Sequence, residues 1–259
     1  MSNSLDALLV YQSQHPKIRL GSMGDGGYVI ADDIQYDLLL SCGISNNVDF
    51  EEHFIEKYKT KCLAFDGTIN DIPNNLSNIE FIRKNITNTE AENTTNLLNI
   101  IENNDNIFLK MDIETNEYQW LGVLENKHLM KFKQIIMEFH FPFAENRDDL
   151  FERLSYPISV EKRLQCLQKI VDTHYLIHLH GNNYGGTMIY NNILIPNVFE
   201  CTYVRKDLCN NIKYNNKEIP DTALDYANKP GVNDIHLKGY PFEGVRPILY
   251  KRIFRSKIL

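Results

Sequence analysis

Residues 106–121 read Asn-Ile-Phe-Leu-Lys-Met-Asp-Ile-Glu-Thr-Asn-Glu-Tyr-Gln-Trp-Leu, and this stretch decides the fold. It begins with the apolar residues 107–109, the pattern of a strand buried on both faces. Asp112 and Glu114 then follow abruptly, and a helical period begins at Glu117. A buried strand that ends in two acids before a helix places carboxylates at the carboxyl edge of a parallel sheet, where open α/β folds bind ligands. The alternative is that the acids only cap the next helix.

Apolar runs and helical periods alternate along the rest of the chain. Beyond the opening stretch, strands are expected at residues 37–42, 61–65, 79–86, 133–142, 175–186 and 193–205, with a last strand near 235–237. Helical periods cover residues 4–15, 48–58, 94–103 and 160–174. This alternation predicts an α/β fold with a mostly parallel seven-stranded sheet and helices on both faces.

The length of 259 residues suits a single domain, 1–259. Its expected parts are an N-terminal helix with a glycine-rich element (1–36), a core (37–205), and a C-terminal excursion with a last strand (206–259). The basic stretch at 251–257 is expected to be a solvated terminal strand or a frayed end, and the alternative is a contact to a nucleotide-diphosphate substrate.

Composition excludes several classes of protein. The formal net charge of −7 argues against broad nucleic-acid binding, which needs a basic face. Five cysteines without C-x-x-C spacing indicate reduced thiols, not a disulfide framework or a zinc site. No signal peptide and no apolar run of membrane-spanning length is present, so we expect a cytoplasmic protein without a membrane span. Whether the protein forms a homo-oligomer is left open by the sequence.

The segment from residue 37 to residue 67 has the pattern of a nucleotide-binding strand–helix–strand unit. Asp66 follows Gly43 by 23 positions, close to the spacing at which an acid at the end of the second strand binds a ribose. The G-x-G-x-x-G and G-x-x-x-x-G-K-[ST] fingerprints are absent. Acids also crowd the start of the following helix, where they would repel a pyrophosphate. S-adenosylmethionine has an ammonium, a sulfonium and a ribose but no phosphate, so this unit favours a methyl donor over a dinucleotide.

A glycine-rich turn precedes that unit. Residues 24–28 read Gly-Asp-Gly-Gly-Tyr and lead into a strand. One interpretation is a hairpin whose glycines adopt positive φ. The other is a backbone that a ligand approaches closely, with Asp25 directed toward that ligand.

Polar side chains end three successive predicted strands. The strand-end residues are Asp112 and Glu114, then Glu138 and His140, then His178, His180, Asn182 and Asn183. Because parallel strand ends share one edge, we expect these side chains to converge on one cleft. His140 or His180 would serve as a base of near-neutral pKa for a hydroxyl. Alternatively, Asp112, Glu138 and His140 would bind a divalent cation, Mg or Mn.

These motifs resemble the FkbM-type S-adenosylmethionine-dependent methyltransferases. Residues 110–117, Lys-Met-Asp-Ile-Glu-Thr-Asn-Glu, are similar to the family signature K-x-D-x-E-G-x-E, and residues 24–29 to its G-D-G-G-Y-V element. Ser41-Cys42-Gly43 corresponds to the glycine loop, Asp66 to the ribose acid and residues 136–140 to the fifth-strand element. Thr115 departs from the signature, because the family usually has glycine there. We therefore expect the backbone near Glu114 to turn differently from that of the family.

The resemblance implies a Rossmann-like class I methyltransferase fold. It also implies O-methylation of a sugar or nucleotide-activated sugar, often for a surface polysaccharide such as a capsule. The expected donor-binding residues are Gly24, Asp25, Gly26, Gly27, Tyr28, Cys42, Gly43, Asn46, Asn47, Asp66, Gly67 and Asp112. The expected catalytic residues are Asp112, Glu114, His140 and His180.

Other functions stay open at this stage. A nucleic-acid methyltransferase is disfavoured by the net charge and by the lack of a [DN]-P-P-[YFW] element. A non-catalytic module that binds a nucleotide sugar would retain the same fold. An NAD oxidoreductase ranks last, because its fingerprint is missing.

Overall fold

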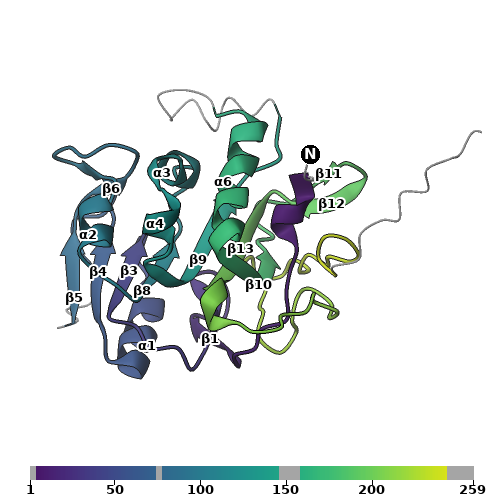
Figure 1. Ribbon diagram of the computed structural model, residues 1–259, viewed down its shortest axis with the longest axis horizontal. Coiled ribbons are helices and arrows are strands. Elements are labelled where there is room, and N and C mark those ends of the chain that lie inside the picture. Colours follow the sequence, from purple (N-terminus) through teal and green to yellow (C-terminus); the bar gives the residue numbers. More distant parts are fainter. Residues whose placement is uncertain (1–3, 74–77, 146–157, 244–259) are drawn as a thin grey trace, which may run out of the picture.

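A seven-stranded sheet forms the centre of the computed structural model, which describes residues 4–73, 78–145 and 158–243 (Figure 1). Its strand order is β10-β13-β9-β8-β3-β4-β5. The antiparallel strand β13 lies between β9 and β10, and the pairs from β9 to β5 are parallel. The strands are β3 (Leu38–Cys42), β4 (Lys61–Phe65), β5 (Ile79–Ile82), β8 (Ile107–Met111), β9 (Phe132–His140), β10 (His174–Gly181) and β13 (Val198–Arg205). The predicted mostly parallel seven-stranded α/β sheet is confirmed.

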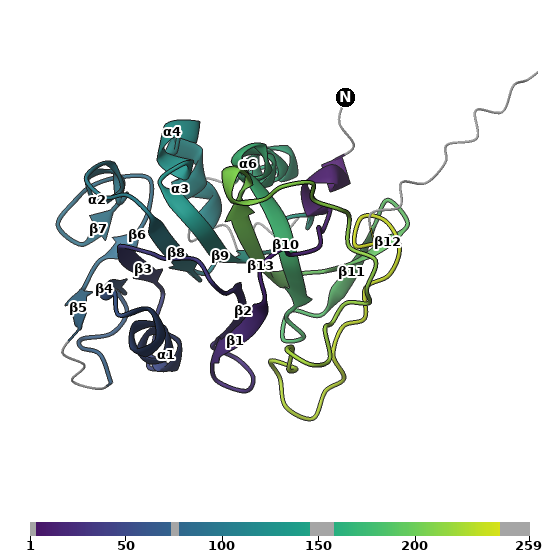
Figure 2. The same cartoon turned by 60° about the horizontal axis from the view of Figure 1, so that its bottom comes forward.

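The two faces of the sheet are covered differently (Figure 2). Helix α1 (Asp49–Tyr58) and the hairpin of β1 (Lys17–Gly21) and β2 (Gly27–Ala31) lie on one face. The opposite face carries α2 (Leu98–Glu102), α3 (Glu117–Val123), α4 (Asn126–Leu129), α6 (Val160–Thr173) and the 3-10 helix η1 (Ser4–Leu8). Helices therefore occupy both faces, as predicted.

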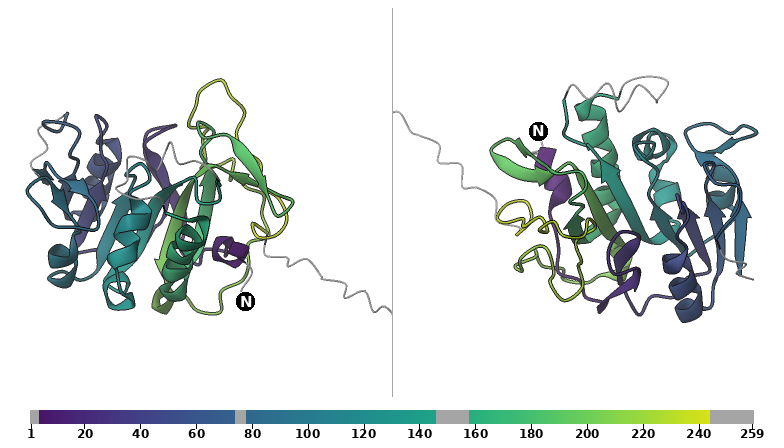
Figure 3. Two further views of the ribbon diagram at one scale, coloured as in Figure 1. Left: turned by 90° about the horizontal axis from the view of Figure 1, so that it is seen from above. Right: turned by 180° about the vertical axis from the view of Figure 1, so that it is seen from behind.

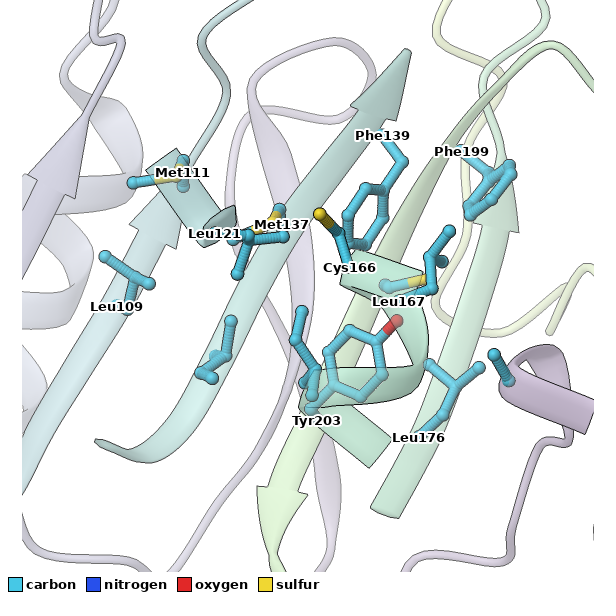
Figure 4. Packing of buried hydrophobic residues seen from close by; sticks show 14 of the residues in the cluster. Leu109, Met111, Leu121, Met137, Phe139, Cys166, Leu167, Leu176, Phe199 and Tyr203 are labelled. Carbon is cyan, nitrogen blue, oxygen red and sulfur yellow. The ribbon is translucent and has the colours of Figure 1, made fainter. Parts of the chain in front are cut away.

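Alternation along each strand divides the core into two layers. On β3, Leu39 packs toward α1 and the hairpin, whereas Leu38 and Leu40 pack toward the larger helical layer. In that helical layer, Met137 and Leu167 lie among the buried side chains between β9 and α6 (Figure 4). Because both faces of the central strands are buried, their sequences are continuously apolar up to the strand ends.

The structure differs from prediction at both ends of the chain. Only η1 is helical within the expected helix 4–15, because the following residues run extended. There the Tyr11 and Gln12 amides donate to Leu176 O and Lys213 O, at 2.8 Å each. The expected strand near 235–237 is reduced to one bridge between Leu237 and Ile219. Pro220 follows that bridge and has no N–H with which to extend the pairing.

Two further segments are more divided than expected. The range 94–103 contains β7 (Thr94–Thr95), paired with β6 (Asn85–Ile86), and then the short helix α2. The expected strand 193–205 is two strands, and β12 (Ile193–Pro196) turns away to pair with β11 (Thr187–Tyr190). After η2 (Lys206–Leu208), the chain to residue 243 is largely irregular and lies near the β10 edge of the sheet (Figure 3). The basic stretch 251–257 lies outside the described residues.

His174, at the start of β10, is buried in its neutral form. Its ring nitrogens lie 2.7 Å from Thr173 Oγ1 and 3.0 Å from the Phe132 carbonyl oxygen. Burial disfavours the imidazolium and lowers the pKa of His174 to about 4. Since the unfolded chain takes up this proton near the ordinary pKa of about 6.5, the stabilisation is complete above that pH and is lost as pH falls toward 4.

We predict that wild type loses about 2 kcal/mol of unfolding free energy between pH 7.5 and pH 5 through this residue. His174→Gln cannot titrate, so its urea unfolding should lack this component. Subtracting the two pH dependences isolates His174 from other titrating groups. An equal difference between the two proteins at both pH values would contradict the assignment.

Candidate active site at the carboxyl edge of the sheet

A row of polar side chains crosses the sheet where its apolar strands end. Glu138 on β9 pairs with Glu200 on β13, and Glu200 pairs with His180 on β10. Paired residues of adjacent strands point to the same face, so these three lie side by side on the hairpin face. Asp112, just after β8, joins them on that face, where its Oδ2 lies 3.4 Å from the Tyr28 hydroxyl of the hairpin. Asp112, Glu138 and His180 therefore converge as predicted, whereas His178 and Asn183 do not join them. His178 Nε2 lies 2.9 Å from Asp225 Oδ1, and Asn183 Nδ2 donates to backbone carbonyl oxygens of residues 229, 232 and 233.

The turn after β3 packs directly on the end of β8. Gly43 has φ +76°, and a Cβ at this position would lie 1.6 Å from the Asp112 carbonyl oxygen. The Asp112 amide donates to Cys42 O at 3.0 Å, and the buried Lys110 ammonium donates to Gly43 O at 2.6 Å. Only glycine permits this approach.

A cavity of about 290 Å³ opens beside that turn. Its volume is close to the lower end of the range of about 300–1,000 Å³ that is typical of small-molecule sites. Five of the expected site residues line it: Gly43, Asp66, Gly67, Asp112 and Glu114. Residues that sequence reasoning did not select also line it, namely Ser45, Phe65, Thr68, Lys84, Asn85, Ile86, Ile113 and Asn116.

Asp66 ties two loops of this cavity together. Its Oδ2 accepts from the Ser45 amide at 2.8 Å, and its Oδ1 accepts from the Thr68 amide at 2.7 Å and the Thr68 hydroxyl at 2.5 Å. Burial alone would raise the pKa of Asp66, but these hydrogen bonds outweigh burial and lower it. An anionic acceptor therefore faces the cavity at neutral pH.

The other expected donor-binding residues lie near the cavity but do not line it. Gly24, Asp25, Gly26 and Gly27 form the turn of the β1–β2 hairpin. The Cys42 side chain is fully buried in the helical layer, and Asn46 is exposed. Asn47 accepts from the Asp49 amide at 2.9 Å, at the start of α1.

The turn after Asp112 is strained. Glu114 and Thr115 have φ values of +53° and +78°, in the left-handed region that favours glycine. Thr115 thus adopts a glycine-like conformation at the position where the family signature has glycine, at a cost of about 1–2 kcal/mol. The turn places the largely exposed Glu114 carboxylate 3.5 Å from His140 Nε2.

His140 stands among four carboxylates. Its Nε2 lies 3.5 Å from Glu114, 3.7 Å from Glu138 and 3.9 Å from Asp112. On the other side of the ring, Glu117 Oε1 accepts from the His140 amide at 2.8 Å and lies 3.3 Å from Nδ1. Glu117 thereby fixes the orientation of the imidazole.

The histidines hold their protons more tightly than sequence reasoning expected. Burial lowers the pKa of His140, but Glu117, Glu138 and Asp112 outweigh it and raise the pKa to about 10. Hydrogen bonds to Asp234 and Glu200 likewise raise the pKa of His180 to about 10. Conversely, burial and then Asp112 raise the pKa of Glu138 well above its usual range. At neutral pH His140 and His180 are therefore imidazolium ions, and the group that accepts the proton is to be sought among the carboxylates.

Sequence reasoning missed three polar residues of this region. Glu200 is a buried acid in an apolar strand, and that contrast was a usable signal. Glu117 was interpreted as the start of a helix and as the last Glu of the family signature, but it was given no role in the site. Asn228 lies in the irregular excursion, where no periodicity marks it, yet it is 2% exposed.

The Methyltransferase FkbM domain profile matches residues 22–158, more than half of the chain. The chain belongs to the FkbM methyltransferase family. The sheet order and the site at its carboxyl edge thus confirm the Rossmann-like methyltransferase fold that the resemblance implied. No match was found among curated proteins.

The similarity of this chain to solved structures is low. A chain of a fibrillarin/Nop5p complex is 9% identical with a TM-score of 0.37, and the match covers 65% of this chain and 72% of that chain. The Methanococcus jannaschii fibrillarin pre-rRNA processing protein is 10% identical with a TM-score of 0.37, and the match covers 76% of this chain and 88% of that chain. A putative methyltransferase from Thermoplasma acidophilum is 10% identical with a TM-score of 0.31, and the match covers 67% of this chain and 69% of that chain.

Among the described residues, no helix combines the length and apolarity that crossing a membrane requires.

Gly43→Ala should disrupt both the fold and the cavity of this methyltransferase. The added methyl would collide with the Asp112 carbonyl in a left-handed conformation, so we expect a loss of at least about 3 kcal/mol in unfolding free energy. Gly122 of α3 is the matched control, since a Cβ there meets nothing within 4 Å. Gly122→Ala should stabilise the protein by about 0.5–1 kcal/mol. Urea unfolding that shows similar effects for both variants would refute the close approach.

Proposed function

We propose that this FkbM-family methyltransferase transfers a methyl group from S-adenosylmethionine to a hydroxyl of a sugar or nucleotide-activated sugar. The main support for this proposal is the position of Asp112. It lines the 290 Å³ cavity, and its Oδ1 lies 3.9 Å from His140 Nε2 in the acid–histidine cluster. A donor in the cavity and an acceptor at the cluster would therefore meet at this residue, which favours in-line transfer.

The residues that line the cavity suit the donor. The bound donor would supply an electrophilic methyl group on its sulfonium. Asp66 would accept hydrogen bonds from the ribose, and the exposed edge of the Gly43 turn would contact the methionyl part. Lys84 and Asn85, beyond β5, would lie near the base. Of the other expected donor residues, Tyr28 would act through Asp112, whereas Cys42, Asn46 and Asn47 would shape the loop.

Activation of the acceptor hydroxyl falls to the cluster around His140. As an imidazolium, His140 would stabilise the developing alkoxide, and Glu138 or Glu114 would take the proton. His180 is held between Glu200 and Asp234, so its contribution would be electrostatic.

A divalent cation is a second way to activate the hydroxyl. Ligand atoms of Asp112, Glu114 and His140 lie within 4.8 Å of one another, and the Asp112 Oδ1 is buried without a hydrogen-bond partner among the described residues. Two carboxylates and an imidazole suit Mn²⁺ or Mg²⁺. We therefore propose Glu114 as a ligand beside Asp112 and His140, with Glu138 adjacent. Binding would displace the His140 proton.

The remaining functional assignments extend the same proposal. A glycan acceptor is consistent with a role in surface polysaccharide synthesis, such as that of a capsule, from the cytoplasm. A nucleic-acid acceptor is disfavoured by the acidic charge of −7 and the carboxylates of the site. An inactive nucleotide-sugar module would bind acceptor without turnover.

We expect S-adenosylmethionine to bind the wild-type protein in isothermal titration. Asp66→Ala removes the acceptors for the ribose and for the Ser45 and Thr68 amides, so affinity should fall at least about tenfold. Asp66→Asn keeps the shape of the side chain and should lower the affinity less. Asp105→Asn, an exposed acid paired with Lys131, is the matched control and should bind normally. Absence of binding by wild type would refute the donor assignment.

Mn²⁺ should raise the melting temperature if the cation proposal is right. At a free concentration of 100 times Kd, the expected stabilisation is about 2.7 kcal/mol, or several degrees. Asp112→Asn should abolish the shift. Glu102→Gln, which alters a carboxylate 3.2 Å from His128 Nε2, away from the cluster, should retain the shift. A shift that survives in Asp112→Asn would place the ion elsewhere.

A further inference from the structure

Asn183 joins the loop after β10 to the irregular excursion. Its Oδ1 accepts from the Lys229 amide at 2.7 Å, and its Nδ2 donates to the Lys229 carbonyl oxygen at 3.3 Å. The Asn183 side chain is buried, so these hydrogen bonds are shielded from water. Asn183 thereby fixes the backbone of Lys229 beside the residue that follows it in the loop, Tyr184.

Tyr184 is an exposed aromatic residue on a loop whose backbone is firmly held. The residue is 59% exposed, and its amide donates to Asn182 Oδ1 at 2.9 Å. The next residue, Gly185, accepts from Asn197 Nδ2 at 2.9 Å, and a Cβ on Gly185 would lie 2.6 Å from Val198 Cγ2. A large side chain that is exposed on a fixed loop is typical of a binding surface.

This loop is joined directly to the acid–histidine cluster around His140. The Asn182 side chain accepts from the Tyr184 amide and donates to Glu138 Oε1 at 3.0 Å. Strand β10 lies at one edge of the sheet, and the donor cavity lies on the other side of β9, beside β3 and β8. Neither Tyr184 nor Lys229 lines that cavity. The cluster therefore stands between the donor cavity and the Tyr184 loop.

The Lys229 ammonium lies over the Tyr184 ring, 5.8 Å from the ring centroid. Within the described part of the chain, this ammonium has no carboxylate partner. Lys229 is exposed, and Tyr184 is exposed even with the ammonium in this position. A positive charge and an aromatic ring are thus presented together to a ligand, next to the cluster.

We propose that Tyr184 and Lys229 form an outer subsite of the acceptor site, which binds a sugar ring that carries an anionic group. The apolar C–H face of a pyranose would stack on the Tyr184 ring, because an aromatic side chain offers a large and rigid contact surface. The Lys229 ammonium would pair with a carboxylate or phosphate of the sugar. This inference rests on the proposed function, and it makes the acceptor an acidic sugar.

Charge would also determine the direction in which the acceptor lies. The carboxylates of the cluster repel an anion, whereas Lys229 attracts it. The anionic end of the acceptor would therefore stay at the Tyr184 loop, and a hydroxyl at the other end would be directed toward His140 and the donor. A neutral sugar would keep the stacking contact but would have no such preference for one direction.

The test compares anionic sugars with their neutral counterparts. Wild type, with S-adenosylhomocysteine and EDTA present, is titrated with glucuronic acid, galacturonic acid, glucose 1-phosphate and galactose 1-phosphate, and with glucose and galactose, and binding is followed by ligand NMR. At low ionic strength, at least one anionic sugar should bind about fivefold or more tighter than its neutral counterpart. This preference should shrink in about 0.5 M NaCl, because salt screens an exposed charge.

Substitutions separate the effect of the charge from that of the ring. Lys229→Gln should remove the preference for anionic sugars, whereas Lys229→Arg should keep most of it. Tyr184→Ala should weaken anionic and neutral sugars alike, by about fivefold or more, and Tyr184→Phe should retain binding. Both residues are exposed, so these variants leave the core intact.

The opposite end of β10 provides matched controls. There the Lys206 ammonium lies over the Tyr175 ring, 5.2 Å from its centroid, so the same kind of pair occurs away from the cluster. Tyr214 is an exposed tyrosine at that end, and its ring stacks on Tyr11. Lys206→Gln and Tyr214→Ala should leave the affinity for every sugar unchanged.

Four results would overturn the subsite. They are equal affinity for anionic and neutral sugars, no measurable binding of any anionic sugar, a preference unchanged in Lys229→Gln, and an affinity unchanged in Tyr184→Ala. A preference for the phosphates alone would identify the anion as a phosphate, and one for the uronic acids alone as a carboxylate. Separate titration of wild type with S-adenosylmethionine distinguishes failure of the subsite from failure of the proposed function, since only the latter abolishes donor binding.

Discussion

The contact between the Gly43 turn and the Asp112 backbone is the constraint on which the site depends. It joins the ends of β3 and β8, and the buried Lys110 ammonium secures it by donating to Gly43 O. One side of this contact is the cavity, and the other is the acid–histidine cluster. Because a Cβ at residue 43 would overlap the Asp112 carbonyl, the geometry of both halves is set by the absence of a single side chain.

The register of the strands then determines which polar side chains lie together at the edge of the sheet. Once β9, β13 and β10 are paired, Glu138, Glu200 and His180 must share a face. Like charges side by side would destabilise the sheet, and amide side chains separate them. Asn182 donates to Glu138 at 3.0 Å and Asn228 to Glu200 at 2.7 Å. Each of the two adjacent carboxylates therefore accepts a hydrogen bond, which offsets part of the cost of placing them side by side.

The sequence predicted what local patterns determine. Apolar strands that end in acids located the sheet edge, and the spacing of Gly43 and Asp66 located the cavity. The sequence did not reveal partners brought together from distant segments, such as Asn228 and Asp25, because no period links them. The pKa values of the histidines could not be predicted from the sequence either. That of His140 depends on burial and on carboxylates from the end of β8, from α3 and from β9. The irregular C-terminal excursion was predicted, but the extent of the helix in 4–15 and the strand near 235–237 were wrong, because tertiary contacts outweighed local propensity there.

Thr115 gives the turn after β8 a property that glycine would not. Glycine would adopt φ +78° without strain but would also sample many other conformations. A β-branched residue held in the same conformation by its surroundings has far fewer alternatives. The backbone that carries Glu114 is thus held in one conformation before any ligand arrives, and the backbone part of the ordering entropy that binding would otherwise cost has already been met by folding.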